Sequence, residues 1–352
     1  MAAITLEGVG RKTDDGVTIL DDVSFHVAEG ELVVVVGPSG SGKTSIIRLI
    51  AGLDKMTSGA VFFDDVDFTS VQTAERDVGI VFQEHALFPT HTARGNVGFP
   101  LKVRSMSNDD IRKRVDAEAR ALGIGHIMER WPKQLSAGHQ QLVQMARAMV
   151  RVPNVLLLAE PMAHLDMPTR KRLRRDCMEL QRGYGVTRGY APNDPAEALC
   201  VADRIVALED GRLRQIGPPE ELYARPADAH IAWLTGPISF LDAGVERDSD
   251  GYWIVGEGFR VRAWPPELGR QVNRRITVGI RPEGLRLVDD STVRALVDSP
   301  SFESGTPVTR VRFGGGVVAM AELAAERGDE VGVSLDSFLI FDDAERLVAA
   351  VG

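Results

Sequence analysis

The sequence contains, between residues 32 and 44, the segment Leu32-Val33-Val34-Val35-Val36-Gly37-Pro38-Ser39-Gly40-Ser41-Gly42-Lys43-Thr44. Its apolar beginning, rich in β-branched residues, is typical of a buried parallel strand. The part from Gly37 to Thr44 matches the pattern G-x-x-x-x-G-K-[ST], and residues 45–50 have the apolar spacing of a helix. Strand, loop and helix follow in the order that the pattern requires. The segment therefore predicts a loop that binds the phosphates of a nucleoside triphosphate.

Each residue type in this loop has a chemical reason to be there. Glycines let successive backbone N–H groups curl around phosphate oxygens, and the start of the following helix adds partial positive charge. Lys43 is expected to contact the β- and γ-phosphates, and the Thr44 hydroxyl to hold Mg²⁺. A glycine-rich turn that matches the pattern by chance is disfavoured, because both flanks fit. The predicted phosphate-binding residues are Gly37, Pro38, Ser39, Gly40, Ser41, Gly42, Lys43, Thr44 and Ser45.

The composition fits a chain of two domains and argues against a general nucleic-acid surface. The chain has 352 residues and a net charge of −9. Its two cysteines, Cys177 and Cys200, indicate no disulfide framework and suit a reducing compartment. No apolar run approaches the ~18–20 residues of a membrane-spanning helix. Residues 1–10 alternate in polarity and predict an edge strand rather than a signal peptide.

The remaining patterns predict an α/β domain followed by a smaller β domain. Residues 4–9, 17–27 and 60–64 read as short strands, with a turn at Asp21-Asp22 dividing the second. Residues 78–82 and 155–159 read as buried strands, and the segment between them is helical in texture, with helix N-caps at Ser107 and Ser136. After about residue 234, glycines and short alternating segments predict an all-β, barrel-like domain. We place the boundary near Thr235-Gly236-Pro237.

Four stretches, in order, resemble the ATP-binding subunits of ABC transporters. They are the loop at 37–44, Gln83 after its strand, Leu135-Ser136-Ala137-Gly138-His139, and Glu160-Pro161 followed by His164-Leu165-Asp166. Residues 82–89, 220–226 and 276–283 resemble the importer branch that serves sugars and related solutes. The resemblance implies a P-loop NTPase domain of the ABC ATPase type over residues 1–235, with a helical subdomain at about 84–150. It also implies an OB-like regulatory domain over residues 236–352.

The resemblance further implies a dimer in which each ATP lies between one subunit's phosphate loop and the other's Ser136 and Gly138. It assigns Glu160 as the general base for the attacking water, with Lys43 and Gln83 also catalytic, and Thr44 and Gln83 as Mg²⁺ ligands. The implied partners are a second ABC ATPase subunit, two transmembrane permease subunits and, indirectly, an extracytoplasmic solute-binding protein. The chain would then lie at the cytoplasmic face of the membrane.

Several positions depart from the family's pattern. Ala159 stands where the family has the aspartate that orients Mg²⁺ and its water, and Asn193 stands where it has a histidine that contacts the γ-phosphate. Thr13 replaces an aromatic residue that stacks on adenine, and the stretch after Ser136 has Ala137 and His139 for glycine and glutamine. We therefore expect ATP binding with weak or absent hydrolysis at this chain's own site, and a heterodimer with a more orthodox ATPase subunit. A homodimer stays open, but both of its sites would then carry the changes at 159 and 193.

Two other functions are weighed against a transporter subunit. The first is a regulatory ATP sensor outside transport, whose β domain binds a protein or small ligand. The second is a nucleic-acid-associated ABC protein, which the acidic charge and single nucleotide domain disfavour. The histidines show no metal-ligand spacing, so no metal beyond nucleotide-bound Mg²⁺ is expected.

Overall fold

The computed structural model describes residues 2–82, 86–161, 185–192, 194–288, 291, 293–303, 306–313, 316–320 and 326–352. The chain divides into two compact units, residues 1–219 and 220–352. Within the described ranges, no helix is long and apolar enough to cross a membrane.

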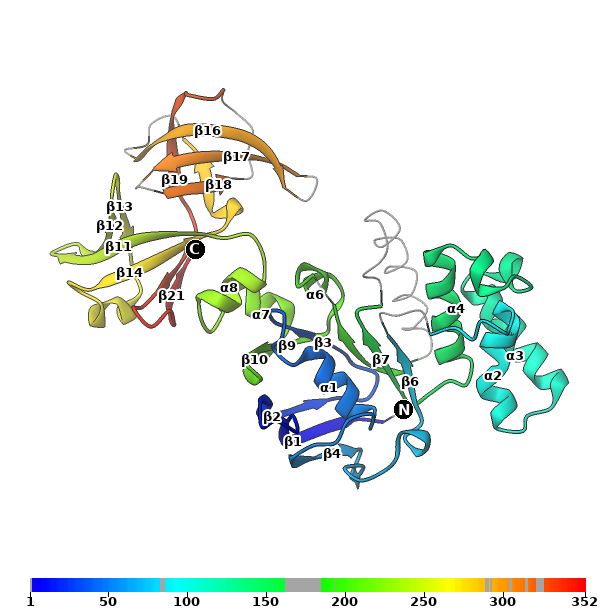
Figure 1. The fold of residues 1–352 in the computed structure, drawn as a ribbon. Helices are drawn as coiled ribbons and strands as arrows, with labels where there is room; N and C mark the ends of the chain where they lie inside the picture. The colour runs from blue at the N-terminus through cyan, green and yellow to red at the C-terminus, as the bar shows by residue number, and fades with distance from the viewer. Residues whose placement is uncertain are drawn as a thin grey trace. The chain divides into compact units, whose positions relative to one another are not determined.

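The first unit is built on a six-stranded sheet, in which β3 lies between β9 and β8 (Figure 1). In spatial order its strands are β10 (Arg212–Gly217), β9 (Arg204–Glu209), β3 (Leu32–Val36), β8 (Thr187–Ala191), β7 (Val155–Ala159) and β6 (Val78–Val81). All pairs are parallel except β10 with β9. Every residue of β3, β7 and β8 is buried. This burial on both faces explains the unbroken apolar runs by which two of these strands were predicted.

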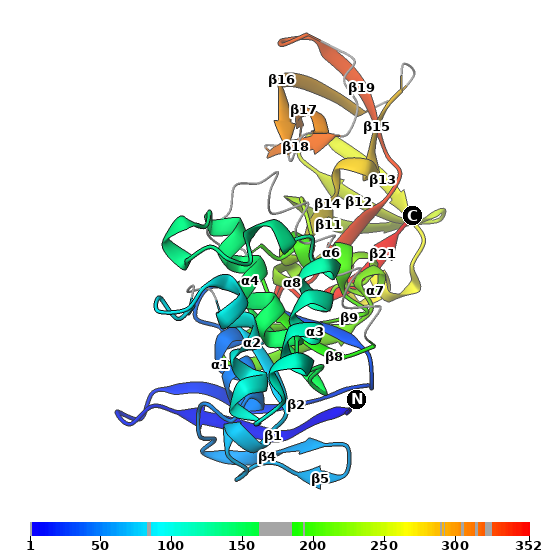
Figure 2. The same ribbon diagram turned by 90° about the vertical axis from the view of Figure 1, so that its right-hand side faces the viewer.

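A second, antiparallel sheet lies on the side of helix α1 (Lys43–Ile50) opposite to the six-stranded sheet (Figure 2). Its strands are β2 (Thr18–Val27), β1 (Ile4–Lys12), β4 (Ser58–Phe63) and β5 (Val66–Asp67). Helix α1 (Lys43–Ile50) buries four apolar residues in a core that also contains side chains of both sheets. The turn predicted at Asp21-Asp22 is wrong, because β2 continues through it. A positive φ of 55° at Asp22 and shifts in the register with β1 absorb the irregularity instead.

The helical layer of the first unit joins β6 to β7. It contains α2 (Ala93–Val103), α3 (Asn108–Ala121), α4 (Ala137–Met149) and the short 3₁₀ turns η2 (Gly125–Ile127) and η3 (Pro132–Gln134). The predicted N-caps are confirmed, since the Ser107 and Ser136 hydroxyls accept from the backbone N–H groups of Asp110 and His139. Apolar side chains of all three helices form one cluster of their own. The unit also contains η1 (Thr73–Glu75) and α6 (Ala196–Val201).

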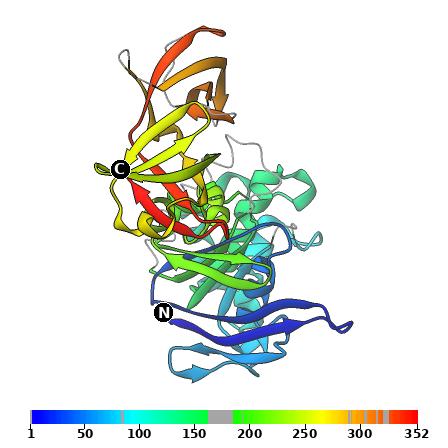
Figure 3. The same ribbon diagram turned by 90° about the vertical axis from the view of Figure 1, so that its left-hand side faces the viewer.

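The second unit consists of two antiparallel sheets around a shared apolar core, as predicted (Figure 3). The first has, in order, β13 (Phe259–Ala263), β12 (Gly251–Gly256), β11 (Ser239–Asp248), β14 (Arg275–Ile280), β20 (Phe338–Phe341) and β21 (Leu347–Val351). The second has β15 (Leu285–Leu287), β19 (Glu330–Leu335), β16 (Val293–Glu303), β17 (Thr306–Phe313) and β18 (Gly316–Met320). Two further 3₁₀ turns are η4 (Pro266–Arg270) and η5 (Pro282–Gly284).

The second unit begins earlier than the boundary that the sequence predicts near residues 235–237. Helices α7 (Pro219–Ala224) and α8 (Ala229–Leu234) account for the difference. Arg281, after β14, stacks its guanidinium 3.6 Å from the Tyr223 ring centroid and donates to the carbonyl of Tyr223 and the hydroxyl of Thr235. These contacts hold α7 and the end of α8 to the β structure. A composition change at residue 235 does not reveal them.

Candidate nucleotide-binding site

The loop between β3 and α1 has a backbone that requires glycine. Gly37, Gly40 and Gly42 have φ values of 153°, 83° and 98°, a region that other residues rarely adopt. A Cβ at Gly37 would lie 2.3 Å from the Leu208 carbonyl oxygen, and one at Gly42 would lie 2.5 Å from Cδ2 of Leu20. At Gly37 and Gly42, the two positions that the sequence pattern reserves for glycine, a side chain is thus excluded both by φ and by neighbouring atoms.

Lys43 folds back over this loop. Its Nζ donates to the carbonyl oxygens of Gly37 at 2.9 Å and Pro38 at 2.8 Å. Burial lowers the pKa of Lys43, and the nearby Glu160 carboxylate opposes that shift. A phosphate that replaced the two neutral carbonyls would give this partly desolvated cation an anionic partner.

The donors of the loop fit an anion. The Ser41 hydroxyl is buried and has no hydrogen-bond partner among the described residues. The cap residue of α1 is Gly42, so no side chain caps the helix, and its first turn has no acidic residue. The first N–H groups of a helix lack partners within it, so those of Lys43, Thr44 and Ser45 are available to phosphate oxygens. This arrangement matches the predicted triphosphate site.

The described residues offer fewer candidate ligands for Mg²⁺ than donors for phosphate. The side chain of Thr44 is exposed, whereas Ala159 is a buried methyl at the end of β7. Gln83 lies outside the described residues. No group of three His, Cys, Asp or Glu side chains able to hold a metal occurs in the described part of the chain. Because Mg²⁺ commonly binds through one or two protein groups, substrate phosphates and water, the Thr44 hydroxyl fits such an ion beside a bound triphosphate.

Glu160 lies directly after Ala159, at the carboxyl end of the parallel sheet. Its φ of 49° is unusual for a residue with a side chain, and its N–H donates to the Ala191 carbonyl oxygen at 2.9 Å. The Glu160 carboxylate favours the charged form of Lys43, the other predicted catalytic residue of this edge, against the larger effect of burial. Of the other residues on which the resemblance rests, His164, Asp166 and Asn193 lie outside the described part of the chain.

Ser136 and Gly138 are at the start of α4, in the helical layer, and Figure 1 shows this helix apart from α1. The Ser136 side chain is exposed, and the His139 ring meets the His126 ring at a centroid distance of 5.6 Å with the planes 76° apart. Within one chain the structure thus does not bring these residues to the phosphate loop. Thr13 lies in a tight turn, where its N–H donates to the Val17 carbonyl oxygen at 2.9 Å.

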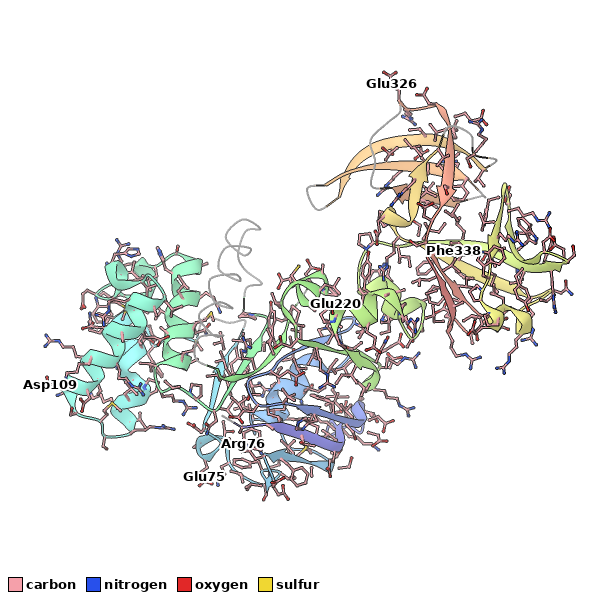
Figure 4. The ribbon with its side chains drawn as sticks, turned by 180° about the vertical axis from the view of Figure 1, so that it is seen from behind. Glu75, Arg76, Asp109, Glu220, Glu326 and Phe338 are labelled. Atoms are coloured by element: carbon pink, nitrogen blue, oxygen red, sulfur yellow. The ribbon has the colours of Figure 1, made fainter. Side chains whose placement is uncertain are left out.

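Two arginines that no sequence pattern singled out support α1. At its first turn, Arg11 of β1 donates to the Ser45 hydroxyl at 3.3 Å and pairs with Asp54 at 2.5 Å. At its other end, the buried Arg76 (labelled in Figure 4) donates only to backbone carbonyls among the described residues, and burial lowers its pKa. Its acceptors are Leu49 (3.0 Å), Ile50 (2.8 Å), Phe68 (2.6 Å), Thr69 (3.4 Å) and Val71 (2.9 Å).

Comparison with known proteins agrees with this description. A family model described as ABC transporter matches residues 20–163. The chain is 36% identical to the trehalose/maltose import ATP-binding protein of Thermococcus litoralis, over 97% of this chain and 96% of that protein. It is also 36% identical to the sn-glycerol-3-phosphate import ATP-binding protein of Bordetella pertussis, over 82% and 80% of the two chains.

Solved structures are similar to somewhat more than half of the chain. The cbiO1 protein from Clostridium perfringens, part of an ABC transporter complex, matches with a TM-score of 0.59 and 28% identity, over 63% of this chain and 90% of that one. A dimeric ATP-binding cassette in a post-hydrolysis state, bound to ADP and phosphate, matches with a TM-score of 0.55 and 30% identity, over 61% and 98%.

The fold and the loop define an α/β nucleotide-binding domain of the P-loop class, followed by a unit of two β-sheets. Within that class, the chain belongs to the family of ATP-binding subunits of ABC importers. The family and the fold class inferred from the sequence are thereby confirmed.

Proposed function

We propose that the chain is the ATP-binding subunit of an importer for a sugar or a related solute. The observation that carries this proposal is the similarity to a trehalose/maltose import protein along 97% of the chain, which includes the β unit as well as the nucleotide domain. On this proposal the chain acts at the cytoplasmic face of the membrane, bound to two permease subunits that receive solute from an extracytoplasmic binding protein. We assign nucleotide binding to the first unit, residues 1–219, and regulation to the β domain that the sequence predicts over residues 236–352.

On this proposal, different residues of the chain bind the phosphates, bind Mg²⁺ and complete the site of a second subunit. The loop at 37–44 and Lys43 hold the phosphates, and the Thr44 hydroxyl and Gln83 hold Mg²⁺, which supplies positive charge beside the phosphate oxygens. Ser136 and Gly138, at the start of α4, complete the site on the other subunit's phosphate loop. The exposure of Ser136 and the place of this helix start away from α1 support a role toward a second subunit.

We also propose that hydrolysis at the chain's own site is weak. Glu160 is the candidate base, and its carboxylate favours the charged form of Lys43. The methyl group of Ala159 has no oxygen with which to orient a metal-bound water, and Asn193 replaces a side chain that contacts the γ-phosphate. Each preorganised electrostatic contact is worth about 2.7–4 kcal/mol in such sites, a factor of ~10²–10³ in rate.

Because the chain's own site is proposed to be slow, we also propose that the chain pairs with an unlike ATPase subunit in a heterodimer. A second ATPase subunit with an aspartate and a histidine at the corresponding positions would hydrolyse ATP in the site that this chain completes with Ser136 and Gly138. In a homodimer both sites would be slow. The test is to purify the chain from membranes with its bound subunits, identify them, and measure ATP binding and hydrolysis by the chain alone.

Two permeases and an unlike ATPase in the purified complex, with tight ATP binding and little turnover by the chain alone, are the expected results. A complex that contains a single kind of ATPase subunit would contradict the heterodimer. Ordinary ABC ATPase turnover by the isolated chain would contradict the weak site. Recovery of a soluble partner in place of permeases would favour the regulatory ATP sensor.

A further inference from the structure

One face of the second unit carries exposed aromatic and charged side chains together. In the first sheet of this unit, β11, β12 and β13 are neighbours (Figure 1). Glu246 of β11 is opposite Trp253 of β12, and Trp253 is opposite Arg262 of β13. Side chains of residues directly opposite one another share a face of a sheet, as do alternate residues of a strand. The group, here named the Trp–Arg face, consists of Glu246, Asp248, Trp253, Arg260, Arg262 and Trp264.

The Trp–Arg face is the exposed part of a larger sheet surface. Another part is covered, because Ala232 of α8 packs into an apolar cluster with Phe341 of β20. The Phe341 ring also meets the ring of Phe240 in β11, at a centroid distance of 6.0 Å. Alternation places Phe240 on the same face as Glu246. By contrast, 65% of Trp264 and 57% of the Glu246 side chain are exposed. This part of the sheet therefore presents large side chains to solvent.

Contacts within the face hold both indole rings in place. The Trp253 Nε1 donates to Oδ2 of Asp248 at 2.6 Å. The Arg262 guanidinium lies 4.0 Å from the Trp264 ring centroid and 5.9 Å from that of Trp253. Arg262 also donates to the carbonyl oxygen of Asp250. The exposed Trp264 ring is thus backed by a cation that is itself anchored. A ring held in this way loses little freedom when a ligand binds, which lowers the entropic cost of binding.

The charges of the Trp–Arg face balance one another. The arginines Arg260 and Arg262 are matched by the carboxylates of Glu246 and Asp248. Nη2 of Arg260 lies 3.5 Å from Oε2 of Glu246 and 3.8 Å from Oδ2 of Asp248. An anion or an acidic protein segment is attracted by cations without such counter-charges. The core of a protein–protein interface is depleted of charged residues. The face therefore fits a neutral ligand with polar groups better than either of these partners.

We propose that the Trp–Arg face binds a neutral saccharide. A sugar ring has a face of C–H groups, which suits the exposed indole of Trp264, and a rim of hydroxyls that both donate and accept hydrogen bonds. The guanidinium of Arg262 supplies donors, and the carboxylates of Glu246 and Asp248 supply acceptors. Few protein surfaces offer an aromatic ring with both kinds of polar group around it.

In an importer subunit, such a site would make the β unit responsive to sugar on its own side of the membrane. This regulatory meaning rests on the proposed function. The binding itself does not, because it needs neither nucleotide nor permease.

Saturation-transfer difference NMR on the full-length purified chain, without nucleotide, tests the proposal. The method detects weak ligands, and weak binding is expected because an exposed face buries little of a ligand's surface. The probes are glucose and maltose. Sorbitol is the control ligand, since it has the hydroxyls of a sugar without a closed ring.

The variants are W264A, W264F, R262M and W233A. Trp233 provides the matched control, because it is 60% exposed and lies on α8 of the same unit. Self-association of each chain is measured by analytical ultracentrifugation, and melting curves report whether each variant folds.

In the unaltered chain and in W233A, we expect saturation to reach the ring C–H protons of both sugars and to leave sorbitol unaffected. In W264A the signal should fall about tenfold or more, because truncating an aromatic anchor removes most of the energy of a contact. R262M removes the cation behind the ring and should lower the signal by about threefold. W264F keeps an aromatic ring and should retain part of the signal. It serves as the readout if W264A does not fold.

The absence of transfer to either sugar in the unaltered chain overturns the inference, as does an undiminished signal in W264A. Equal transfer to sorbitol overturns it too, because the contact would then be with hydroxyls in general. Self-association that W264A abolishes and sugar does not affect would assign the face to a second copy of the chain instead. A chain that binds sugar but copurifies with no permease would keep this inference and contradict the proposed function. A chain that copurifies with permeases but binds no sugar would do the reverse.

Discussion

The loop at 37–44 and the strand end at 159–160 lie at the same edge of the central sheet, but they differ in how many residues of the family's pattern they keep. The loop keeps its three left-handed glycines, its folded-back Lys43 and an uncapped helix start. At the strand end, Glu160 is present and its carboxylate favours the charged form of Lys43, but the residue before it is Ala159, whose side chain is a methyl group. On the proposed function, this contrast predicts that the chain binds a triphosphate through the loop and hydrolyses it slowly at the strand end. The two activities would then depend on separable groups, which the following variants test.

The largest effect should come from restoring the strand end. In the double variant A159D/N193H, we expect ATP hydrolysis to rise by ~10²-fold or more, because a missing electrostatic contact costs about 2.7–4 kcal/mol. ATP affinity should change by less than about threefold. Steady-state phosphate release measures the first and equilibrium binding the second. As control, adding E160Q to the double variant should abolish the gain. No gain in A159D/N193H would mean that the two positions do not limit the chemistry.

The next largest effect, a loss of ATP affinity, should come from removing the positive charge of Lys43 in the phosphate loop. K43M removes a cation that is expected to make charged hydrogen bonds to phosphates, each worth about 1.5–3 kcal/mol. We therefore expect ATP affinity to fall ~10–100-fold, measured by titration calorimetry. Lys55, an exposed lysine outside the loop, provides the control K55M, which should bind ATP as the unaltered chain does. Equal affinity in K43M and the unaltered chain would remove the loop from the binding site.

A smaller effect on binding, with a larger one on stability, is expected at the far end of α1. R76M leaves carbonyls that are now bonded to a buried guanidinium without donors, which costs about 3 kcal/mol in the free energy of unfolding. ATP affinity of the folded variant should fall only a few-fold. Denaturant unfolding of R76M is compared with that of E75Q, a change at the exposed neighbour (Figure 4). An R76M chain as stable as E75Q would show that these bonds contribute little.

The smallest effect on ATP affinity is expected from a change at Tyr223 in the second unit. Burial and a hydrogen bond to Glu283 raise the pKa of Tyr223 to about 12, above its ordinary value near 10. Between these values the unfolded chain loses the phenol proton first, so the folded unit should lose stability as pH rises from about 10 to 12.

Thermal melts at these pH values, compared with the Y223F variant, measure this slope. Y223F should flatten it without altering ATP affinity at neutral pH. The same slope in both chains would assign the loss to other groups.

Resemblance and spacing predicted most residues of the candidate site, but not the arginines that hold the surrounding elements in place. Glycines, Lys43 and Thr44 lie next to one another in the chain, where spacing reports on geometry directly. Arg11, Arg76 and Arg147 are three among 41 Lys and Arg residues. Their partners lie far from them in sequence, so no local pattern distinguishes them from a solvated arginine. The predicted boundary near residue 235 lies later than the observed start of the second unit for a similar reason. Arg281 donates hydrogen bonds to Tyr223 and Thr235, which are distant from it in sequence.

The sequence alone determined that the chain has a phosphate-binding loop, an α/β domain before a β domain, and the ordered motifs of an ABC ATPase. These features depend on short-range spacing and on the period of apolar residues, which a strand or helix imposes locally. The tertiary structure decided which side chains face one another. It folded Lys43 back onto the carbonyl of Gly37, tied α7 and the end of α8 to the β unit through Arg281, and attached Ala86 to α4 through Arg147. Such contacts arise only when distant segments pack and a buried polar group must find a partner.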